Sequence, residues 1–287
     1  MQTAGETPTV LSSSRYRYSR HSSMASRAAQ KQAARERRLA AEREQAERAA
    51  RDRRLRMLGG VVILAAAIIA VAIAISSGGG SSAPKLNSAG ASQAAASVDG
   101  LLAGIPQSGN TLGSPAAKVT VTEFGDLKCP ICREFALGAE NQLISNEVRT
   151  GKAKLVYRSL CTATCAGPQP GVFPVQQSAV YAAGLQNKAW YFIELFYHLQ
   201  GDETTSYVDA NFLGGLARLV PGLNYSKWQS DSALPTLKAQ VTADQNFAAS
   251  KSWTGTPTVS VVGPKGEQDF TSLADYSSLQ SAIKTVS

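Results

Sequence analysis

The chain has 287 residues and a net charge of +8, and the whole of that excess lies in its first fifth. Residues 1–57 contain 14 Lys or Arg against 6 Asp or Glu, whereas residues 58–287 contain 15 of each and are neutral overall. The high isoelectric point therefore belongs to a tail and gives no ground for expecting a nucleic-acid-binding protein.

The basic tail favours a helix that stays in solvent. Residues 24–56 are rich in Ala, Arg, Glu and Gln, which are strong helix formers, and Glu44 and Arg48 are an oppositely charged pair at i,i+4 spacing. Apolar residues larger than Ala are almost absent there, so a coiled coil is excluded. We expect residues 1–57 to form a basic, helical cytoplasmic tail that also contacts anionic lipid.

A strongly apolar segment follows the tail. Residues 58–75, LGGVVILAAAIIAVAIAI, contain no charged side chain over 18 positions. As a helix they would extend about 27 Å, close to the hydrocarbon thickness of a bilayer. A buried core helix and a cleaved signal peptide are the alternatives, but a signal peptide has an apolar core of only about 7–15 residues. We therefore predict an uncleaved transmembrane helix at 58–76.

The charges beside this segment predict its orientation. RDRRLR at 51–56 precedes it, and no basic residue follows it until Lys85. Positive flanks stay in the cytoplasm, so we expect a single-pass protein of the cell membrane with everything after Ser76 outside. Residues 77–114, which are mostly Gly, Ser, Ala and Asn, are predicted to be a flexible linker.

The next part of the chain reads as a strand, a helix and a second strand. KVTVTEF at 118–124 has the alternation of a strand, GDLK turns the chain, and PICREFALGAENQLISNEVRTG supplies a helix from 130 to 151. KLVYRSL at 154–160 predicts the second strand. Cys129 thus stands at the helix N-terminus, with Pro130 at the first position, where no N–H group is needed.

This position has consequences for the CPIC motif, Cys129 to Cys132. The exposed N–H groups and the dipole of a helix N-terminus favour a thiolate and lower the pKa of Cys129. Cys132 is one turn further on, where its sulfur is shielded yet close enough for a disulfide with Cys129. We expect Cys129 to be the attacking or attacked sulfur and Cys132 to resolve the mixed disulfide. Lys128 and Arg133 are expected to add modestly to the stability of the thiolate.

A block of helices separates these elements from the end of the chain. Apolar residues recur at helical spacing between 175 and 251, with a break at Asn187 and Lys188. A strand then opens on Thr256 and Pro257 in WTGTPTVSVVG, EQDFTS pairs with it across a turn, and DYSSLQSAIKTV closes the chain as a helix.

The order of these elements and three of their sequences carry a family resemblance. VTEFGDLKCPICREF, SAVYAAGLQNKAWYFIELF and GTPTVSVVG make residues 115–287 resemble the DsbA-like thiol:disulfide oxidoreductases of the bacterial cell envelope. The resemblance implies an α/β, thioredoxin-like fold with an inserted α-helical domain at about 165–250.

The resemblance also implies roles for residues outside the motif. In this family a cis Thr-Pro peptide faces the two cysteines, which assigns Thr256 and Pro257 to the catalytic site. Glu123, six residues before Cys129, matches a buried acid that takes part in proton transfer, and Asp126 matches an acid of the turn. Between the cysteines the best-known members have a His that stabilises the thiolate. This chain has Pro and Ile there, so we expect an oxidase of moderate strength.

The four cysteines also allow other interpretations. Cys129 and Cys132 could bind zinc together with Cys161 and Cys165, but a zinc ribbon needs both pairs on tight knuckles, and the first pair opens a long helix. A copper site at Cys161 and Cys165 would need a distant His, and His198 lies on an apolar helix where packing is the simpler role. In an oxidising compartment Cys161 and Cys165 are expected to form a structural disulfide, with a second redox relay as the alternative. No metal or cofactor is expected.

Two classes of function remain open from the sequence. One is an enzyme that introduces or exchanges disulfides in exported proteins, with a reductase or isomerase as the alternative direction. The other is a non-catalytic thioredoxin-like module that only binds a partner. Cys129, Cys132, Pro257 and Glu123 favour the enzyme, because a binding module has no need of all four. The expected partners are cysteine-containing exported proteins and a membrane quinone-linked reoxidase.

Overall fold

The computed structural model describes residues 85–86 and 88–287 of the chain. The predicted tail at 1–57 and the predicted transmembrane segment at 58–76 lie outside these residues. Within the described part, no helix is both long enough and apolar enough to cross a membrane.

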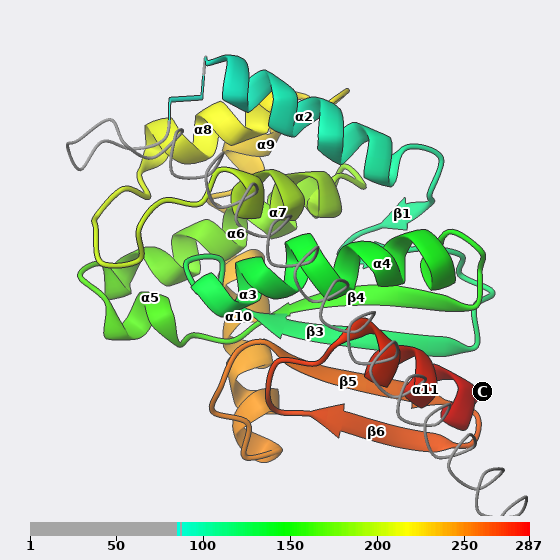
Figure 1. Cartoon of the computed structure of the whole chain (residues 1–287). Coiled ribbons are helices and arrows are strands. Elements are labelled where there is room, and N and C mark those ends of the chain that lie inside the picture. The colour runs from blue at the N-terminus through cyan, green and yellow to red at the C-terminus, as the bar shows by residue number, and fades with distance from the viewer. Residues whose placement is uncertain (1–84, 87) are drawn as a thin grey trace, which may run out of the picture. The chain divides into compact units, whose positions relative to one another are not determined.

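A mixed sheet of six strands runs through the described residues in the order β1-β2-β4-β3-β5-β6 (Figure 1). β3 pairs in parallel with β4 and antiparallel with β5, so both of its edges are hydrogen-bonded. Its sequence, VTVTEFG, is rich in the β-branched residues that pack well on a pleated surface. The strands are β1 (Gln107–Ser108), β2 (Thr111–Leu112), β3 (Val119–Gly125), β4 (Ala153–Ser159), β5 (Thr258–Gly263) and β6 (Gly266–Phe270).

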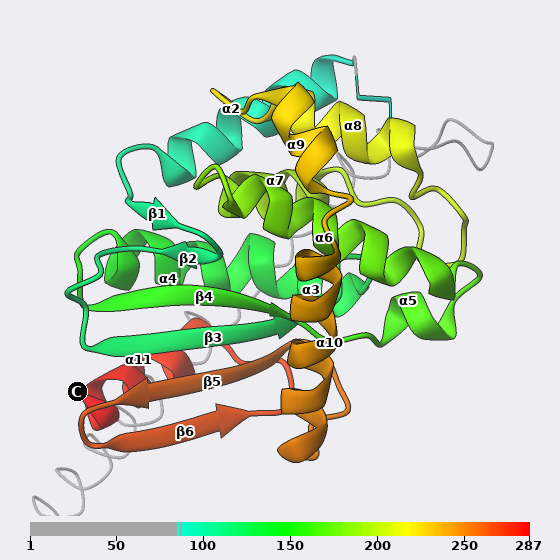
Figure 2. The same ribbon diagram turned by 180° about the vertical axis from the view of Figure 1, so that it is seen from behind.

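Helices cover both faces of this sheet. The helical run after β3 lies on one face with α11 (Tyr276–Val286), and α10 (Pro235–Ser250) lies on the other (Figures 1 and 2). The run contains two π-helical stretches, whose turns hold more residues than the 3.6 of an α-helix. Buried positions therefore stay in line at every fourth residue, from Cys132 through Glu140 to Val148. The run consists of α3 (Pro130–Phe135), η1 (Ala136–Glu140), α4 (Asn141–Leu143) and η2 (Ile144–Val148).

The helical insertion lies between β4 and β5, as the resemblance implies. Two of its helices begin at polar caps, because the side chains of Asp209 and Asn224 accept hydrogen bonds from N–H groups of the first turn. The predicted break falls at Asn187, which holds a positive φ of 58° that Asn tolerates better than most residues. The helices before α10 are α5 (Ala163–Ala166), η3 (Pro170–Val172), α6 (Phe173–Gly184), α7 (Ala189–His198), α8 (Ala210–Leu219) and α9 (Tyr225–Asp231).

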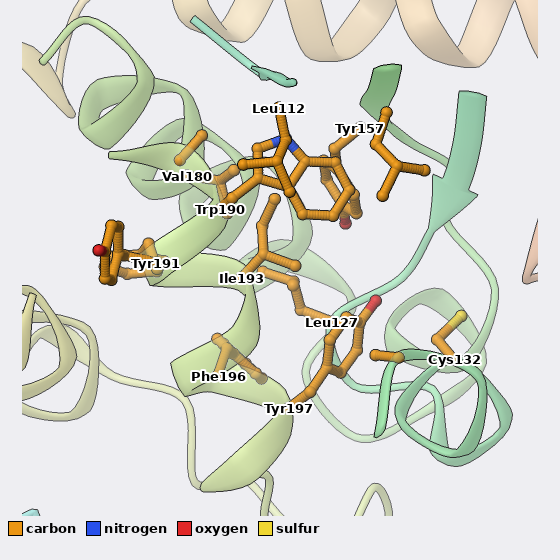
Figure 3. Close-up of a cluster of buried hydrophobic side chains, with 14 of the residues drawn as sticks. Leu112, Leu127, Cys132, Tyr157, Val180, Trp190, Tyr191, Ile193, Phe196 and Tyr197 are labelled. Atoms are coloured by element: carbon orange, nitrogen blue, oxygen red, sulfur yellow. The ribbon is translucent and has the colours of Figure 1, made fainter. Parts of the chain in front are cut away.

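Helix α7 is surrounded on all sides by other parts of the fold. Every residue of it except His198 is buried, which is what a helix with apolar residues all round requires. Figure 3 shows Trp190, Ile193 and Tyr197 of this helix in one buried cluster with Tyr157 of β4. Polar groups that α7 carries are therefore held in the interior, next to the helical run that begins with the CPIC motif.

The predicted flexible linker at 77–114 is wrong from Ser88 onward. Helix α2 (Ala89–Leu102) begins with the side chain of Ser88 as its N-cap, and Tyr191 of α7 donates a hydrogen bond to Asp99 at 3.1 Å. β1 and β2 follow it and extend the sheet beside β4. Composition misled the prediction, because Ala-rich sequence resembles a linker until a surface is present for its small side chains to pack against. The folded part thus begins by Ser88 and not at 115. The residues that α2 buries are Ala91, Ala94, Val98 and Leu102.

The strand register gathers three loops at one end of β3. Phe124 pairs with Thr258, and Gly125 pairs with Ser159. The residues after β3, after β4 and before β5 therefore leave the sheet side by side. These segments hold the CPIC motif, the second pair of cysteines and the Thr-Pro peptide, so strand pairing alone brings together residues that are far apart in the sequence.

Candidate active site

The two cysteines of the CPIC motif differ in exposure. Cys129 caps α3, and its thiol and that of Cys132 are both free. Cys129 keeps 6% of its surface exposed, Cys132 keeps none, and Ile131 between them is 44% exposed. Cys129 is therefore the sulfur that a partner reaches, as the sequence predicts, and Cys132 lies beneath it.

Hydrogen bonds stabilise the thiolate of Cys129. The thiol of Cys132 contributes most, the side chain of Thr256 and the backbone N–H groups of Cys132 and Ile131 add to it, and burial opposes them. Together they lower the pKa of Cys129 from an ordinary 9.0 to about 6. The N–H groups are available because the first turn of a helix has no partners for them within the helix. At neutral pH, Cys129 is therefore mainly a thiolate in the reduced site.

Cys132 has the opposite properties. Burial raises its pKa well above the ordinary 9.0, and the neighbouring Cys129 and Glu123 raise it further. A thiolate at Cys132 is therefore unstable unless a proton is delivered to it within the protein.

The loop before β5 contacts the reactive sulfur. The peptide bond between Thr256 and Pro257 is cis, as the resemblance implies. The thiol of Cys129 donates a hydrogen bond to the carbonyl oxygen of Thr256 at 3.6 Å. At the start of β5, the hydroxyl of Thr258 donates to the carbonyl oxygen of Gly255 at 2.8 Å and fixes the loop. Thr256 thus belongs to the site by direct contact, with Pro257 next to it in the chain.

The two basic residues beside the motif are bound elsewhere. Lys128 is fully buried, and its Nζ donates a hydrogen bond to the carbonyl oxygen of Thr205 at 2.8 Å. Nε of Arg133 donates to the carbonyl oxygen of Tyr197 at 2.9 Å. Neither charge is among the main causes of the low pKa of Cys129, and both groups point their hydrogen bonds away from it. They tie the motif to the helical insertion instead.

Asp126 joins the active-site turn to the loop after β4. The side chain is fully buried and accepts a hydrogen bond from the N–H group of Lys128 at 3.1 Å. It also accepts from the N–H groups of Thr162 at 2.9 Å and Thr164 at 2.8 Å, and from the hydroxyl of Thr164 at 2.5 Å. Hydrogen bonds to a charged acceptor are stronger than neutral ones, so Asp126 fixes the position of the two loops relative to each other.

Three glutamate side chains lie in the interior. Glu123 on β3, Glu140 in the helical run and Glu194 on α7 are fully buried, and within the described residues none of their carboxyl oxygens has a hydrogen-bond partner at ordinary distance. Burial raises the pKa of Glu123 to about 8, an effect that nearby Glu140 and Tyr197 moderate and Cys129 increases. Burial, followed by the charge of Glu123, raises the pKa of Glu194 to about 8 and also raises that of Glu140.

The surroundings of these acids keep them protonated. No Lys or Arg of the described residues is among the groups that shift the pKa values of the three carboxyls. Figure 3 shows Tyr197 and Cys132 within the same buried cluster. A Cβ atom at Gly125 would lie 2.8 Å from Oε1 of Glu123 and 3.1 Å from Oη of Tyr197, so glycine leaves the space that the acid occupies. Of the three, Glu123 acts on the buried thiol of Cys132, and it brings a protonated carboxyl close to that sulfur.

The second pair of cysteines is joined. Cys161 and Cys165 form the disulfide expected from the sequence. Their sulfurs are therefore not thiolate ligands, which removes the zinc interpretation that needs all four cysteines. Within the described residues, no group of three or more His, Cys, Asp or Glu side chains is arranged to hold a metal ion. His198 is half-buried, and burial lowers its pKa, with a smaller effect from Arg133.

The structure brings together Cys129, Cys132, Thr256 and Glu123, which were also selected from the sequence. Other residues of the site were missed. Glu140 and Glu194 each stand among apolar residues on one face of a helix, and that pattern was the signal that could have identified them. No local signal marked the threonine that contacts Thr256 from the loop after β4. The missed residues are Glu140, Glu194 and Thr162.

Comparisons with known proteins agree with this geometry. The chain matches the family model described as Thioredoxin over residues 107–285. It is 26% identical over 164 residues to the probable disulfide bond formation protein D of Bacillus anthracis, covering 57% of this chain and 74% of that protein. It is 24% identical over 173 residues to disulfide bond formation protein D of Bacillus subtilis, covering 60% and 74%. The crystal structure of oxidised BdbD from Bacillus subtilis matches with a TM-score of 0.53 and 22% identity, over 62% of this chain and 94% of that one.

The fold and the paired thiols define a thioredoxin-fold dithiol protein. Because the family model covers more than half of the chain, the chain belongs to the thioredoxin family, and the resemblance to its DsbA-like members is confirmed. Family and site together make it a protein-disulfide oxidoreductase.

Proposed function

We propose that this chain introduces disulfides into exported proteins through Cys129 and Cys132. The observation that carries the proposal is the split between the two thiols, since the pKa of Cys129 is about 6 and that of Cys132 is well above 9.0. A stable thiolate at Cys129 favours the reduced form of the pair, so the disulfide form is the better oxidant. The names of the relatives from Bacillus anthracis and Bacillus subtilis, disulfide bond formation proteins, support this direction.

The first half of the reaction starts from the disulfide between Cys129 and Cys132. A thiolate of the client protein attacks Sγ of Cys129, and a bond forms between the client sulfur and Cys129. The bond between Cys129 and Cys132 breaks, and its electron pair goes to Cys132. The new thiolate at Cys132 takes a proton, and the carboxyl of Glu123 is the acid that acts on this cysteine from the interior.

The second half of the reaction releases the client. A second client thiolate attacks the client sulfur of the mixed disulfide, the client disulfide forms, and Cys129 leaves as a thiolate. Its low pKa makes it a good leaving group without a proton. The client has lost two electrons, which the reduced pair now holds. A membrane quinone-linked partner is the proposed acceptor that returns the pair to the disulfide.

The setting of this reaction is proposed from sequence alone. The apolar segment at 58–76 and the basic RDRRLR before it support a single-pass anchor with the catalytic domain outside the cytoplasm. Disulfide formation is favoured in such compartments, and an anchored domain stays close to a membrane-bound reoxidase.

The test is the direction of exchange. Full-length protein is equilibrated with glutathione buffers, and its disulfide form is mixed with a reduced client that contains several cysteines. We expect a potential between the values for thioredoxin, about −270 mV, and for the strongest DsbA, about −120 mV, together with oxidation of the client. Cys129→Ala is the control and should leave the client reduced. A potential near or below that of thioredoxin without client oxidation would favour the reductase or isomerase.

A further inference from the structure

The hydroxyl group of Thr256 has one proton and more than one neighbour that can accept it. Oγ1 of Thr256 lies 2.5 Å from Oγ1 of Thr162, and either of them has the geometry of a donor. Thr256 also lies against Cys129, whose sulfur is 3.6 Å from its carbonyl oxygen, and its side chain lowers the pKa values of Cys129 and Cys132, as a hydrogen-bond donor does. A hydroxyl donates one hydrogen bond and accepts two. The single proton of Thr256 is free to be donated to a thiolate at Cys129 only when Thr162 is the donor in the contact between the two threonines.

We propose that Thr162 is a positioning residue for disulfide exchange: its hydroxyl donates to Thr256 and directs the single hydroxyl proton of Thr256 towards the sulfur of Cys129. The inference rests on the proposed function and assigns a residue to it. Linked hydrogen bonds polarise one another where the surroundings are of low dielectric, so Thr256 becomes a better donor to the sulfur. Thr162 acts through Thr256 and does not itself touch the reacting atoms.

The backbone around Thr162 is held from several directions. Its N–H group donates a hydrogen bond to Oδ2 of Asp126 at 2.9 Å, which ties it to the turn before the motif. The disulfide between Cys161 and Cys165 closes the chain on both sides of Thr162. The N–H group of Cys161 donates to Oε1 of Gln245 on α10 at 3.1 Å. The disulfide thus has a role near the reaction without carrying electrons, because it keeps Thr162 in register with Thr256.

The strand register explains why a residue of this loop reaches the Thr-Pro segment. Ser159 pairs with Gly125 on one side of β3, and Thr258 pairs with Phe124 on the other. The loop after β4 must cross the end of β3 to meet the segment before β5. The two segments meet at the contact between Thr162 and Thr256. This contact lies next to Cys129, whose thiol donates to the carbonyl oxygen of Thr256.

The experiment removes the hydroxyl of Thr162 and reads the thiolate directly. Thr162→Val keeps the size of the side chain, and the ultraviolet absorbance of the thiolate is titrated in reduced full-length protein. We expect the pKa of Cys129 to rise by about half a unit to one unit, the effect of losing roughly one hydrogen bond, so that the thiolate fraction at acidic pH falls about three- to tenfold. The reduction potential should become more negative, which makes the protein a weaker oxidant. Thr162→Ser restores the hydroxyl and should restore both values.

Matched controls separate positioning from folding. Thr150 is exposed, and its hydroxyl donates to the carbonyl oxygens of Asn146, at 2.8 Å, and Glu147, both in the preceding turn. Thr150→Val should therefore change neither the pKa of Cys129 nor the reduction potential. Should Thr162→Val fail to fold, Thr162→Ala removes the same group with less crowding. Replacing both Cys161 and Cys165 by Ser should also raise the pKa of Cys129, because the disulfide no longer holds Thr162 opposite Thr256.

Three results would overturn the proposal. They are an unchanged pKa in a folded Thr162→Val or Thr162→Ala protein, a failure of Thr162→Ser to restore the pKa, and an unchanged pKa after removal of the disulfide. The titration needs no client. Inactivity of the wild-type protein towards clients would therefore count against the proposed function and leave the result for Thr162 intact.

Discussion

Replacing Glu123 by Gln should stabilise the reduced protein, and the gain should depend on pH. Burial holds the pKa of Glu123 at about 8 in the fold, against 4.5 for an ordinary glutamate. At pH 7 the folded protein therefore keeps a proton that the unfolded chain releases, and this release favours unfolding. With a raised pKa, the full stability is present below pH 4.5 and is lost as the pH rises through 8.

The size of the effect follows from the two pKa values. One pKa unit corresponds to about 1.4 kcal/mol, so between pH 4.5 and pH 7 the buried carboxyl should lower the free energy of unfolding by about 3 kcal/mol. Gln has nearly the same shape and does not ionise. The free energy of unfolding of Glu123→Gln, relative to wild type, should therefore rise by about 3 kcal/mol over this range. Glu140 and Glu194 are present in both proteins, so most of their effect cancels in the difference.

Urea unfolding of the full-length chain measures this difference at a series of pH values. Both proteins are reduced beforehand and kept free of oxygen. Glu134→Gln is the control, because Glu134 is an exposed glutamate on the helical run after β3, and its curve should run parallel to that of wild type. A Glu123→Gln curve parallel to wild type between pH 4.5 and 8 would refute the reasoning, since the carboxyl would then ionise at the same pH in the folded and unfolded chains.

The remaining outcomes concern the motif, the turn before it and the orientation of the chain. Cys132→Ala should accumulate mixed disulfides with clients on non-reducing gels, because the resolving sulfur is gone; trapping by Cys129→Ala instead would reverse the two roles. Alkylation of Cys129 in the reduced protein should accelerate with a midpoint near pH 6, since only the thiolate reacts, and a midpoint near 9.0 would contradict the hydrogen bonds described for it. Asp126→Asn should lower the free energy of unfolding by about 1–3 kcal/mol, because buried N–H groups of two loops lose a charged acceptor; an unchanged urea midpoint would show that the loops hold without it. A reporter fused after Ser287 should be active only outside the cytoplasm, and activity in the cytoplasm would overturn the proposed orientation.

Local rules were enough to predict the chemistry of the motif. A strand of alternating Val and Thr, a short turn and a Pro at the first helical position put Cys129 on a helix N-terminus whatever the rest of the fold does. The free N–H groups of that turn and the shielding of Cys132 one turn further on follow from helix geometry. The low pKa of one thiol and the high pKa of the other were therefore open to prediction from residues 118–135.

The Thr-Pro segment was found through family likeness and not from local rules. Thr256 is 127 positions from Cys129, and nothing in its own neighbourhood marks it as a partner of a thiol. The pairing of β3 with β5 gives the physical reason for their contact, because it starts β5 opposite Phe124. Sequence patterns predicted that both strands exist, whereas their register is a property of the assembled sheet.

Only the tertiary structure decided which polar groups are buried together and where the domain begins. Glu140 faces the interior because π-helical stretches keep every fourth residue of the run in line, and Glu194 does so because α7 is enclosed on all sides. Helix α2 has the composition of a linker, and it becomes part of the domain because its small side chains pack against other elements. Composition and spacing determine the local chemistry of each segment. Burial, and the pKa shifts that burial produces, depend on the surfaces that the fold brings against it.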